Sequence, residues 1–381
     1  MNDNFKMIAK TFFGIEKVLK EELISLGAQN VECGKRMVSF FGDKGFMYKA
    51  NLCLRTALKI LIPIHSFYAN SYDDFYHELN KYEWNKYIGL SNTFLFDSVV
   101  SGNFFHHSLY VSQKAKDALV DQFMSKYNKR PNVDLKYPDF RFHIHIRNNK
   151  CNLLIDSSGE SLHKRGYRVS SDLAPINEVL AAGIIKLSGW DSLTNFLDPM
   201  CGSGTFLIEA AMIACKIPVN LNRDEFAFEK WDDWDENLFS LIKESQLKKV
   251  IKSNTHIYGY EISKSVLSKA KKNISEAGFK DYIKIKHIDF FDTKKSNDKN
   301  LYLILNPPYG ERLKGGINDL YSSIGNTLKK QYSNSDAWII SSNLQAIKNI
   351  GLKPKSKIKL FNGKLESRLL NFPIYEGTKK K

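Results

Sequence analysis

The sequence predicts an α/β protein in which a parallel sheet with helices on both faces follows two smaller α+β units. From Glu178 onward, short apolar runs alternate with apolar helical stretches, which is typical of a parallel sheet covered on both faces. Before that residue, strand-like runs and amphipathic stretches form two separate groups. The chain has 381 residues, and at about one to two hundred residues per domain this length suits two or three domains.

The first unit is expected over residues 1–66. Apolar residues at helical spacing predict a helix over residues 15–26, and Gly27 stands where that helix should end. A second helix is expected from Lys44 to about Leu61, with Pro63 ending it. Strand-like runs flank the first helix at residues 5–9 and 37–41.

The second unit is expected over residues 67–160. Ser112 is placed to cap an amphipathic helix that ends before the turn Lys129-Arg130-Pro131. Strands are expected at 93–100, 140–147 and 151–156, the last two joined by a hairpin turn at 148–150. Residues 101–150 hold nine basic and four acidic residues, an excess that suits nucleic-acid contact and a merely solvated surface equally well.

A polar connector follows at residues 159–177. Lys164, Arg165 and Arg168 surround Tyr167, and basic residues interleaved with an aromatic suit a phosphate backbone and a stacked base. The alternative is an ordinary linker between domains. The candidate RNA-binding residues are therefore Lys129, Arg130, Lys164, Arg165, Tyr167 and Arg168.

The third unit is expected over residues 161–381. Its strand candidates lie at 195–198, 257–261, 283–288, 301–305 and 337–341, and a closing antiparallel hairpin is expected at 357–361 and 368–375. An insert between about Lys216 and His256, containing Trp231-Asp-Asp-Trp234, interrupts the alternation. A polar loop at 294–300 interrupts it again.

The first motif with chemical content is Asp198-Pro-Met-Cys-Gly-Ser-Gly-Thr205, between a strand and an apolar helix. A strand end followed by a glycine turn and a helix start is a nucleotide-type site. Gly202 and Gly204 remove side chains where a ligand would pass close to the backbone. The motif lacks the Gly-Lys-Ser/Thr of a phosphate loop and the three-glycine spacing of a dinucleotide site. A tight turn with no ligand is the alternative.

Two further acidic residues stand at strand ends. Glu261 closes the run Ile257-Tyr-Gly-Tyr-Glu261 and is placed to accept hydrogen bonds from two ribose hydroxyls. Asp289, followed by two phenylalanines, could accept from an adenine amino group. The gap from Asp198 to Glu261 is 63 residues long, so the ribose assignment depends on the strand pattern and not on spacing.

The most specific motif is Asn306-Pro307-Pro308-Tyr309, after a strand that reads as buried. Each proline fixes its own φ and removes an N–H donor, so the turn is stiff. It can present the Asn306 carboxamide oxygen and the Pro307 carbonyl as two acceptors, which match the two N–H groups of an exocyclic amine. Tyr309 offers a face for stacking a base. A simple β-turn is the alternative.

These motifs together resemble the class I S-adenosylmethionine-dependent methyltransferases that act on exocyclic base amines. With Ser158-Gly-Glu-Ser-Leu-His-Lys-Arg-Gly-Tyr-Arg168, Ala174-Pro-Ile-Asn-Glu178 and Arg130-Pro-Asn-Val-Asp134, nearly the whole chain resembles the THUMP-domain RNA methyltransferases, specifically the bacterial 23S rRNA guanine-N2 enzymes. The resemblance implies a ferredoxin-like domain and a THUMP module that bind RNA, then a Rossmann-like, seven-stranded methyltransferase domain. In some relatives such a chain is fused to a second methyltransferase domain, which is not expected here.

The resemblance also implies roles for individual residues. S-adenosyl-L-methionine is the expected cofactor, and Asn306, Pro307, Pro308 and Tyr309 are expected to hold the target base. The segment Pro175–Glu178 is expected to close over the cofactor. The full set expected to bind the cofactor is Pro175, Asn177, Glu178, Asp198, Pro199, Cys201, Gly202, Ser203, Gly204, Thr205, Glu261, Asp289 and Asn306.

The expected function is methylation of the N2 amine of a guanine in RNA, with 23S rRNA or a ribosome assembly intermediate as partner. Three alternatives stay open: an adenine-N6 methyltransferase of nucleic acid, a tRNA guanine-N2 methyltransferase, and a non-catalytic RNA-binding assembly factor. The acceptor pair at Asn306 and Pro307 suits guanine and adenine amines alike.

Composition adds broad expectations. The formal net charge is +15, which favours a polyanionic partner. Apolar runs are too short for a membrane helix, and the amino terminus shows no secretory signal, so a cytoplasmic protein is expected. The five cysteines are scattered, and His143 and His145 have no third partner in the sequence, so no metal is expected.

Overall fold

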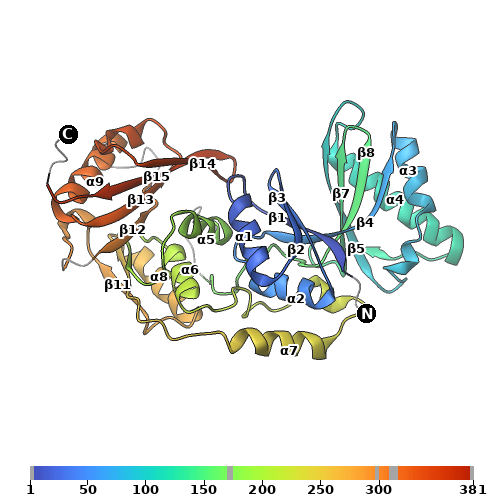
Figure 1. Ribbon diagram of the computed structural model, residues 1–381. Coiled ribbons are helices and arrows are strands. Elements are labelled where there is room, and N and C mark those ends of the chain that lie inside the picture. Colours follow the sequence, from blue (N-terminus) through green and yellow to red (C-terminus); the bar gives the residue numbers. More distant parts are fainter. Residues whose placement is uncertain (1–3, 170–174, 297–299, 309–315, 378–381) are drawn as a thin grey trace.

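The computed structural model describes residues 4–169, 175–296, 300–308 and 316–377. Two β-sheets organise an elongated molecule, with the amino-terminal sheet to the right and the carboxy-terminal sheet to the left (Figure 1). The first sheet has eight strands in the order β2-β3-β1-β4-β8-β7-β5-β6, and the second has seven in the order β11-β10-β9-β12-β13-β15-β14. The α/β class predicted from the sequence is confirmed.

The first sheet is continuous across the two amino-terminal units. Its strand β4 (Lys59–Tyr68) is antiparallel to β1 on one side and to β8 on the other. The expected boundary between residues 66 and 67 therefore falls inside a strand that both units share. The other strands are β1 (Phe5–Lys10), β2 (Gln29–Gly34), β3 (Met37–Gly42), β5 (Thr93–Ser101), β6 (Asn132–Val133), β7 (Phe140–Arg147) and β8 (Lys150–Asp156).

The second helix of the first unit is shorter than predicted. Helix α1 (Glu16–Leu26) ends at Gly27 as expected, but α2 (Lys44–Cys53) stops well before Leu61 because Ile60 and Leu61 are buried in the middle of the sheet. Pro63 does not end a helix and lies within β4. The register of β4 against β8 shifts there, and such an irregularity accommodates a residue without an N–H.

Helices α3 (Tyr72–Lys81) and α4 (Ser108–Tyr127) cover one face of the right-hand part of this sheet (Figure 1). The predicted cap at Ser112 is wrong, because α4 begins one turn earlier. The Ser112 hydroxyl instead donates to Ser98 Oγ at 3.0 Å. The predicted hairpin turn after β7 is confirmed, with Asn148 in the left-handed conformation.

The second sheet confirms the predicted strand alternation. Five strands are parallel, and β15 is antiparallel to both β13 and β14. Helices on both faces bury its apolar side chains, in one core with α5, α6 and α8 and another with α9. The strands are β9 (Asn195–Asp198), β10 (Ile257–Glu261), β11 (Ile283–His287), β12 (Leu301–Leu305), β13 (Ser335–Ser341), β14 (Ser356–Asn362) and β15 (Leu365–Ile374). The helices are α5 (Glu178–Leu187), α6 (Thr205–Ala214), α8 (Lys264–Glu276) and α9 (Ile317–Gln331).

The insert at 216–256 leaves the second sheet and packs on the first unit. Its helix α7 (Glu236–Leu247) lies beneath α2 (Figure 1). The ring of Tyr48 on α2 lies 4.5 Å from the ring of Phe228 and 5.1 Å from that of Trp234, centroid to centroid. The insert therefore fastens the two halves of the molecule together through an aromatic cluster. None of the helices within the described residues is long and apolar enough to span a membrane.

Candidate active site

Four neighbouring strands of the second sheet, β11, β10, β9 and β12, end at one edge with polar side chains. In open parallel sheets, ligands bind in the crevice outside the carboxyl ends of the strands. Here β9 ends at Asp198 and β10 at Glu261, while Asn306 follows β12 and Asp289 follows β11. All four side chains line one cavity of about 610 Å³.

The cavity collects most of the residues expected to bind a cofactor. Of the three expected residues that do not line it, Gly204 begins α6 beside it, and Asn177 and Glu178 line a neighbouring cavity. Ten of the expected residues do line it: Pro175, Asp198, Pro199, Cys201, Gly202, Ser203, Thr205, Glu261, Asp289 and Asn306.

The glycine turn is shaped by two left-handed residues. Gly202 has φ 53° and Gly204 has φ 86°, a region that a side chain with a Cβ rarely adopts. The turn brings the Gly202 N–H to 3.1 Å from Oε2 of Glu261. The first two motifs are thus joined directly, although 59 residues separate these two positions.

Gly259 has a role that the sequence analysis did not identify. A Cβ at this position would lie 2.5 Å from Leu207 Cδ1 and 3.1 Å from Cys201 Sγ. Strand β10 therefore passes close under α6 and the glycine turn only because residue 259 has no side chain. A glycine in the interior of a predicted strand was the signal that could have identified it.

Two of the carboxylates that line the cavity, those of Asp198 and Glu261, are held by backbone N–H groups. Glu261 accepts from Gly202 with Oε2 and from Ser263 N–H with Oε1, at 3.1 and 2.8 Å. Asp198 Oδ1 accepts from Met200 N–H at 3.1 Å. The pKa of Asp198 is raised to about 8, chiefly by burial, while the Met200 N–H lowers it and the Glu261 carboxylate raises it. A cationic group beside Asp198 would relieve this cost of burying a negative charge.

The remaining walls of the cavity suit a flat ring. Asp289 Oδ1 accepts from Phe291 N–H at 3.0 Å, which fixes the turn that follows β11. Phe290, Phe291 and Ile288 supply apolar surface beside that carboxylate. An acceptor next to apolar walls is the arrangement expected for an adenine ring with its amino group.

The target-base motif is at the same cavity. Asn306 and Pro308 line it, and Pro307 is buried behind them. Asn306 is half-buried at the end of β12, so its side chain is positioned by a buried strand and not by a long loop. Tyr309 lies outside the described residues.

Two of the residues expected to contact RNA are interior residues, so that expectation is wrong for them. Arg165 is 2% exposed and forms a buried ion pair with Glu209 of α6, Nε to Oε1, at 3.4 Å. It also donates to the carbonyls of Leu162 and Arg55, both at 2.6 Å. Tyr167 is 2% exposed and donates its hydroxyl to the same Glu209 oxygen at 3.1 Å. This network joins the connector, the first unit and α6.

Arg168 faces the glycine turn. Its Nε lies 2.6 Å from Glu178 Oε1, its Nη1 donates to Ser203 Oγ at 3.1 Å, and its Nη2 donates to Thr205 Oγ1 at 2.9 Å. Nearby, the buried Asn273 of α8 accepts from Val169 N–H and donates to the Ser203 carbonyl, both at 3.1 Å. The end of the connector therefore braces the turn that lines the cofactor cavity.

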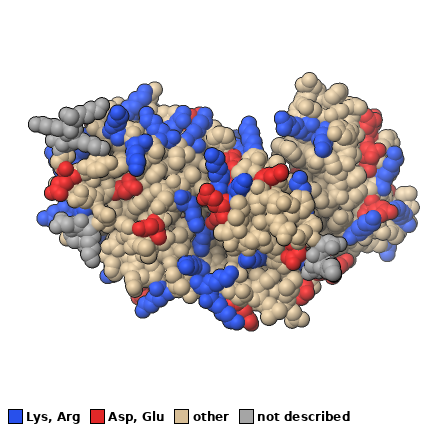
Figure 2. Space-filling model, viewed as in Figure 1, with Lys and Arg blue, Asp and Glu red and all other residues tan. Residues whose placement is uncertain are grey.

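The other expected RNA contacts, Lys129, Arg130 and Lys164, are exposed. On the face shown in Figure 2, Lys and Arg side chains gather over the left half of the molecule and around its middle, where the two halves meet. Within the described residues, no three His, Cys, Asp or Glu side chains are grouped so that they could hold a metal ion.

Three family models match the chain. The RMKL-like methyltransferase domain matches residues 165–371, the RlmL ferredoxin-like domain matches 6–61, and the THUMP domain matches 69–156. The three matches follow one another in the order that the sequence analysis predicted.

Curated relatives match over nearly the whole chain. The ribosomal RNA large subunit methyltransferase K/L of Desulfotalea psychrophila is 35% identical over 378 residues, which are 96% of this chain and 52% of that protein. The Synechocystis protein slr0064, whose name gives RNA methyltransferase as a provisional activity, is 32% identical over 365 residues and 95% of each chain. The chain thus spans about half the length of the K/L relatives it matches.

A solved structure also matches the full length. SMU.472, determined as a complex with S-adenosylhomocysteine, is 31% identical, with a TM-score of 0.87 over 99% of this chain and 100% of that chain. Sequence, family models and fold agree over both halves of the molecule. The chain therefore belongs to the family of RMKL-like methyltransferases that carry a THUMP domain.

Proposed function

We propose that this chain transfers a methyl group from S-adenosyl-L-methionine to the exocyclic N2 amine of a guanine in 23S rRNA. The observation that carries the proposal is one cavity in which the glycine turn, Glu261 and the turn at Asn306 meet. The names of the K/L relatives support ribosomal RNA of the large subunit as substrate. Such a substrate would place the enzyme in the cytoplasm.

The residues present fit a cationic cofactor. Asp198 is a buried carboxyl beside a second carboxylate, and the cavity has no Lys or Arg among its described lining residues. A positively charged ammonium group would remove the cost of ionising Asp198. Glu261 would accept from the ribose hydroxyls, and Asp289 would accept from the adenine amine between its apolar neighbours. When bound, S-adenosylmethionine supplies an electrophilic methyl group on a sulfonium.

The target amine is a weak nucleophile, because its lone pair is delocalised into the guanine ring. The Asn306 carboxamide oxygen and the Pro307 carbonyl would accept its two N–H protons and orient the nitrogen. The stiff double-proline turn would hold both acceptors in place before the base arrives. Positioning of the amine, more than proton transfer, is then the contribution of these residues.

The base must leave its stack to reach this cavity. The Watson–Crick edge of a paired guanine includes N2, so the nucleotide must be unpaired or flipped out of a helix. The excess of 15 positive charges supplies salt-dependent attraction that does not depend on sequence. Selection of one guanine therefore depends on local structure in the RNA and on contacts near the cavity.

The test uses the full chain, S-adenosylmethionine and ribosomal RNA from a strain that lacks the gene, followed by digestion to nucleosides and mass spectrometry. N2-methylguanosine is the expected product. Asn306→Ala is expected to lower turnover by about two orders of magnitude, the scale of one lost preorganised contact, with cofactor affinity little changed. N6-methyladenosine as the sole product would overturn the guanine assignment, and methylation of tRNA alone would overturn the substrate.

A further inference from the structure

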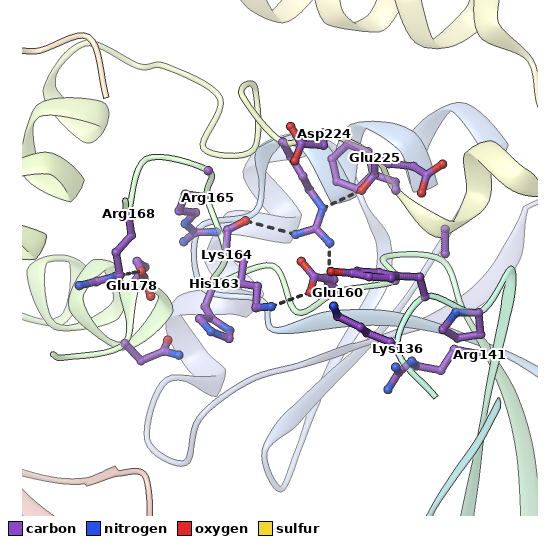
Figure 3. A pocket seen from close by; sticks show the side chains of 18 of the residues that line it. Lys136, Arg141, Glu160, His163, Lys164, Arg165, Arg168, Glu178, Asp224 and Glu225 are labelled. Carbon is purple, nitrogen blue, oxygen red and sulfur yellow. Dashed lines mark hydrogen bonds and ion pairs between the residues drawn. The ribbon is translucent and has the colours of Figure 1, made fainter. Parts of the chain in front are cut away.

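A second cavity, of about 680 Å³, lies between the two halves of the molecule (Figure 3). Its lining residues come from the turn before β7, the start of β7, the connector, the start of α5 and the insert. Pro175 and Ile176 line both this cavity and the cofactor cavity. The two cavities therefore adjoin at these two residues. We call the second one the junction cavity.

Basic residues outnumber acidic residues in the lining of the junction cavity. Its described lining residues include seven Lys or Arg and four Asp or Glu. Figure 3 shows the basic side chains of both halves around the same space. The basic residues are Lys136, Arg141, Lys164, Arg165, Arg168, Arg223 and Lys230, and the acidic residues are Glu160, Glu178, Asp224 and Glu225.

Arg223 is a fixed cation in the wall of the junction cavity. Its guanidinium donates to backbone carbonyls of the connector and the insert at 2.6 to 3.3 Å, and no carboxylate of the described residues forms an ion pair with it. The carbonyls hold the guanidinium in place without cancelling its charge. All five N–H groups of the guanidinium are used in these bonds, so Arg223 would attract a phosphate by its charge and not by donating a hydrogen bond. The accepting carbonyls belong to Ser158, Glu160, Ser161, Lys164 and Glu225.

Across the cavity, the turn before β7 presents an aromatic ring. Asp134 Oδ1 accepts from the N–H groups of Lys136 and Tyr137 at 2.8 and 2.9 Å, which makes the turn rigid. Tyr137 is 57% exposed, and Lys136 Nζ lies 4.9 Å from the centre of its ring. A rigid, exposed tyrosine beside a lysine is the combination that stacks a base and attracts its phosphate.

Lys164 can add to this charge. It lies 2.5 Å from Glu160, but both side chains are about half exposed, so the pair is weak and a phosphate can replace the carboxylate. The junction cavity thus offers the fixed cation of Arg223, the exposed Lys136, and Lys164, whose ion pair a phosphate can replace. The ring of Tyr137 is its stacking surface. These are the features of a site for single-stranded nucleic acid.

We propose that the junction cavity binds the unpaired nucleotides that flank the target guanine, with Tyr137 stacking one base and Lys136, Lys164 and Arg223 attracting phosphates. The proposal deepens the proposed function and rests on it. A cavity of this size admits a nucleotide or two but not an A-form helix, so the substrate must be single-stranded at this point. Because the two cavities adjoin at Pro175 and Ile176, a strand bound in the junction cavity would pass these residues on its way to the cofactor.

The test uses the full chain and an rRNA fragment in two forms, one with the flanks of the target guanine unpaired and one with the flanks paired to a complementary strand. Binding is measured by fluorescence anisotropy, and turnover by methyl transfer. Tyr137→Ala is expected to weaken binding and raise KM about tenfold for the unpaired form, the scale of one lost base–aromatic stack. Tyr137→Phe should restore both, while kcat and cofactor affinity stay unchanged. Tyr127→Ala, at an exposed tyrosine of α4 outside the cavity, is the matched control.

Three outcomes would overturn the assignment. One is equal RNA binding by wild type and Tyr137→Ala, and another is equal loss in Tyr137→Ala and Tyr127→Ala. The third is unchanged RNA binding with lost binding to ribosomal particles, which would indicate a protein partner. Failure of the wild type to methylate either RNA would instead refute the proposed function, and the anisotropy comparison would still test the cavity.

Discussion

The two cavities that meet at Pro175 and Ile176 are built for ligands of opposite charge. The cofactor cavity has acidic side chains and apolar walls, and its carboxylates are held by backbone N–H groups at strand ends. The junction cavity has an excess of basic side chains, carried by loops from both halves of the molecule. Under the proposed function, the difference would separate two tasks: the strand ends would bind a small cation, and the basic side chains of the junction cavity would attract a polyanion. A methyl donor and its nucleic-acid acceptor would meet at the shared wall.

The largest expected effect is that of removing the buried carboxylate of Asp198, which tests whether the two cavities bind different ligands. Asp198→Ala should abolish detectable cofactor binding, since truncating one partner of a buried charged contact costs about 3 kcal/mol, which is more than a hundredfold in affinity. RNA affinity should not change, because the basic residues are elsewhere. Calorimetric titration with S-adenosylmethionine measures the first and anisotropy the second. Asp191→Ala, in an exposed loop of the same half, should leave both unchanged. Full cofactor affinity in Asp198→Ala would refute the cavity assignment.

Two adjacent basic residues of the connector, Lys164 and Arg165, should differ in how much they contribute to the free energy of unfolding. Arg165→Ala should lower the free energy of unfolding by about 3 kcal/mol, because it leaves Glu209 buried without its charged partner. Lys164→Ala, at an exposed ion pair, should change it by less than about 0.5 kcal/mol. Urea denaturation of both variants provides the measurement. If Arg165→Ala is as stable as the wild type but binds RNA less tightly, the result would indicate that Arg165 contacts RNA.

Arg168 tests whether the connector serves the cofactor or the RNA. Arg168→Met removes the donors to Ser203 and Thr205 and should lower cofactor affinity about tenfold, the effect of one or two charged hydrogen bonds to a ligand-binding turn. Arg168→Lys should recover part of the loss. RNA affinity measured without cofactor should stay within about twofold of the wild-type affinity, a change on the scale of one exposed ion pair. Loss of RNA binding with intact cofactor binding would contradict the bracing role.

A smaller expected effect is the release of a proton from Asp198 when the cofactor binds. The pKa of Asp198 is raised to about 8, so in the free protein at pH 7 this carboxyl is mostly protonated. A cationic ligand stabilises the ionised form, so cofactor binding at pH 7 should release close to one proton, and the release should fall as the pH rises past 8. Calorimetry in buffers of different ionisation enthalpy measures it. A release that does not fall as the pH rises past 8 would assign the proton to another group.

The strand ends were predictable for a local reason. Each motif follows its own strand, and the predicted strands at 195–198, 257–261 and 301–305 match β9, β10 and β12 residue for residue. Parallel strands of one sheet have their carboxyl ends at one edge, so residues far apart in the chain converge without any further information. The connector had no such constraint. Its basic residues and tyrosine could face water or the interior, and the pattern alone favoured water.

What the sequence determined by itself were the alternation of helices and strands in the second sheet and the chemistry at the strand ends, because these depend on periodicity, glycine and proline within a few residues. Only the tertiary structure decided which basic side chains face solvent. Arg165 is interior because Glu209 lies opposite it, 44 residues along the chain. The pairing of both amino-terminal units in one sheet and the packing of the insert on α2 also depend on contacts between distant parts of the chain. Pairing across long separations is set by the complementarity of whole surfaces, which no short stretch of sequence contains.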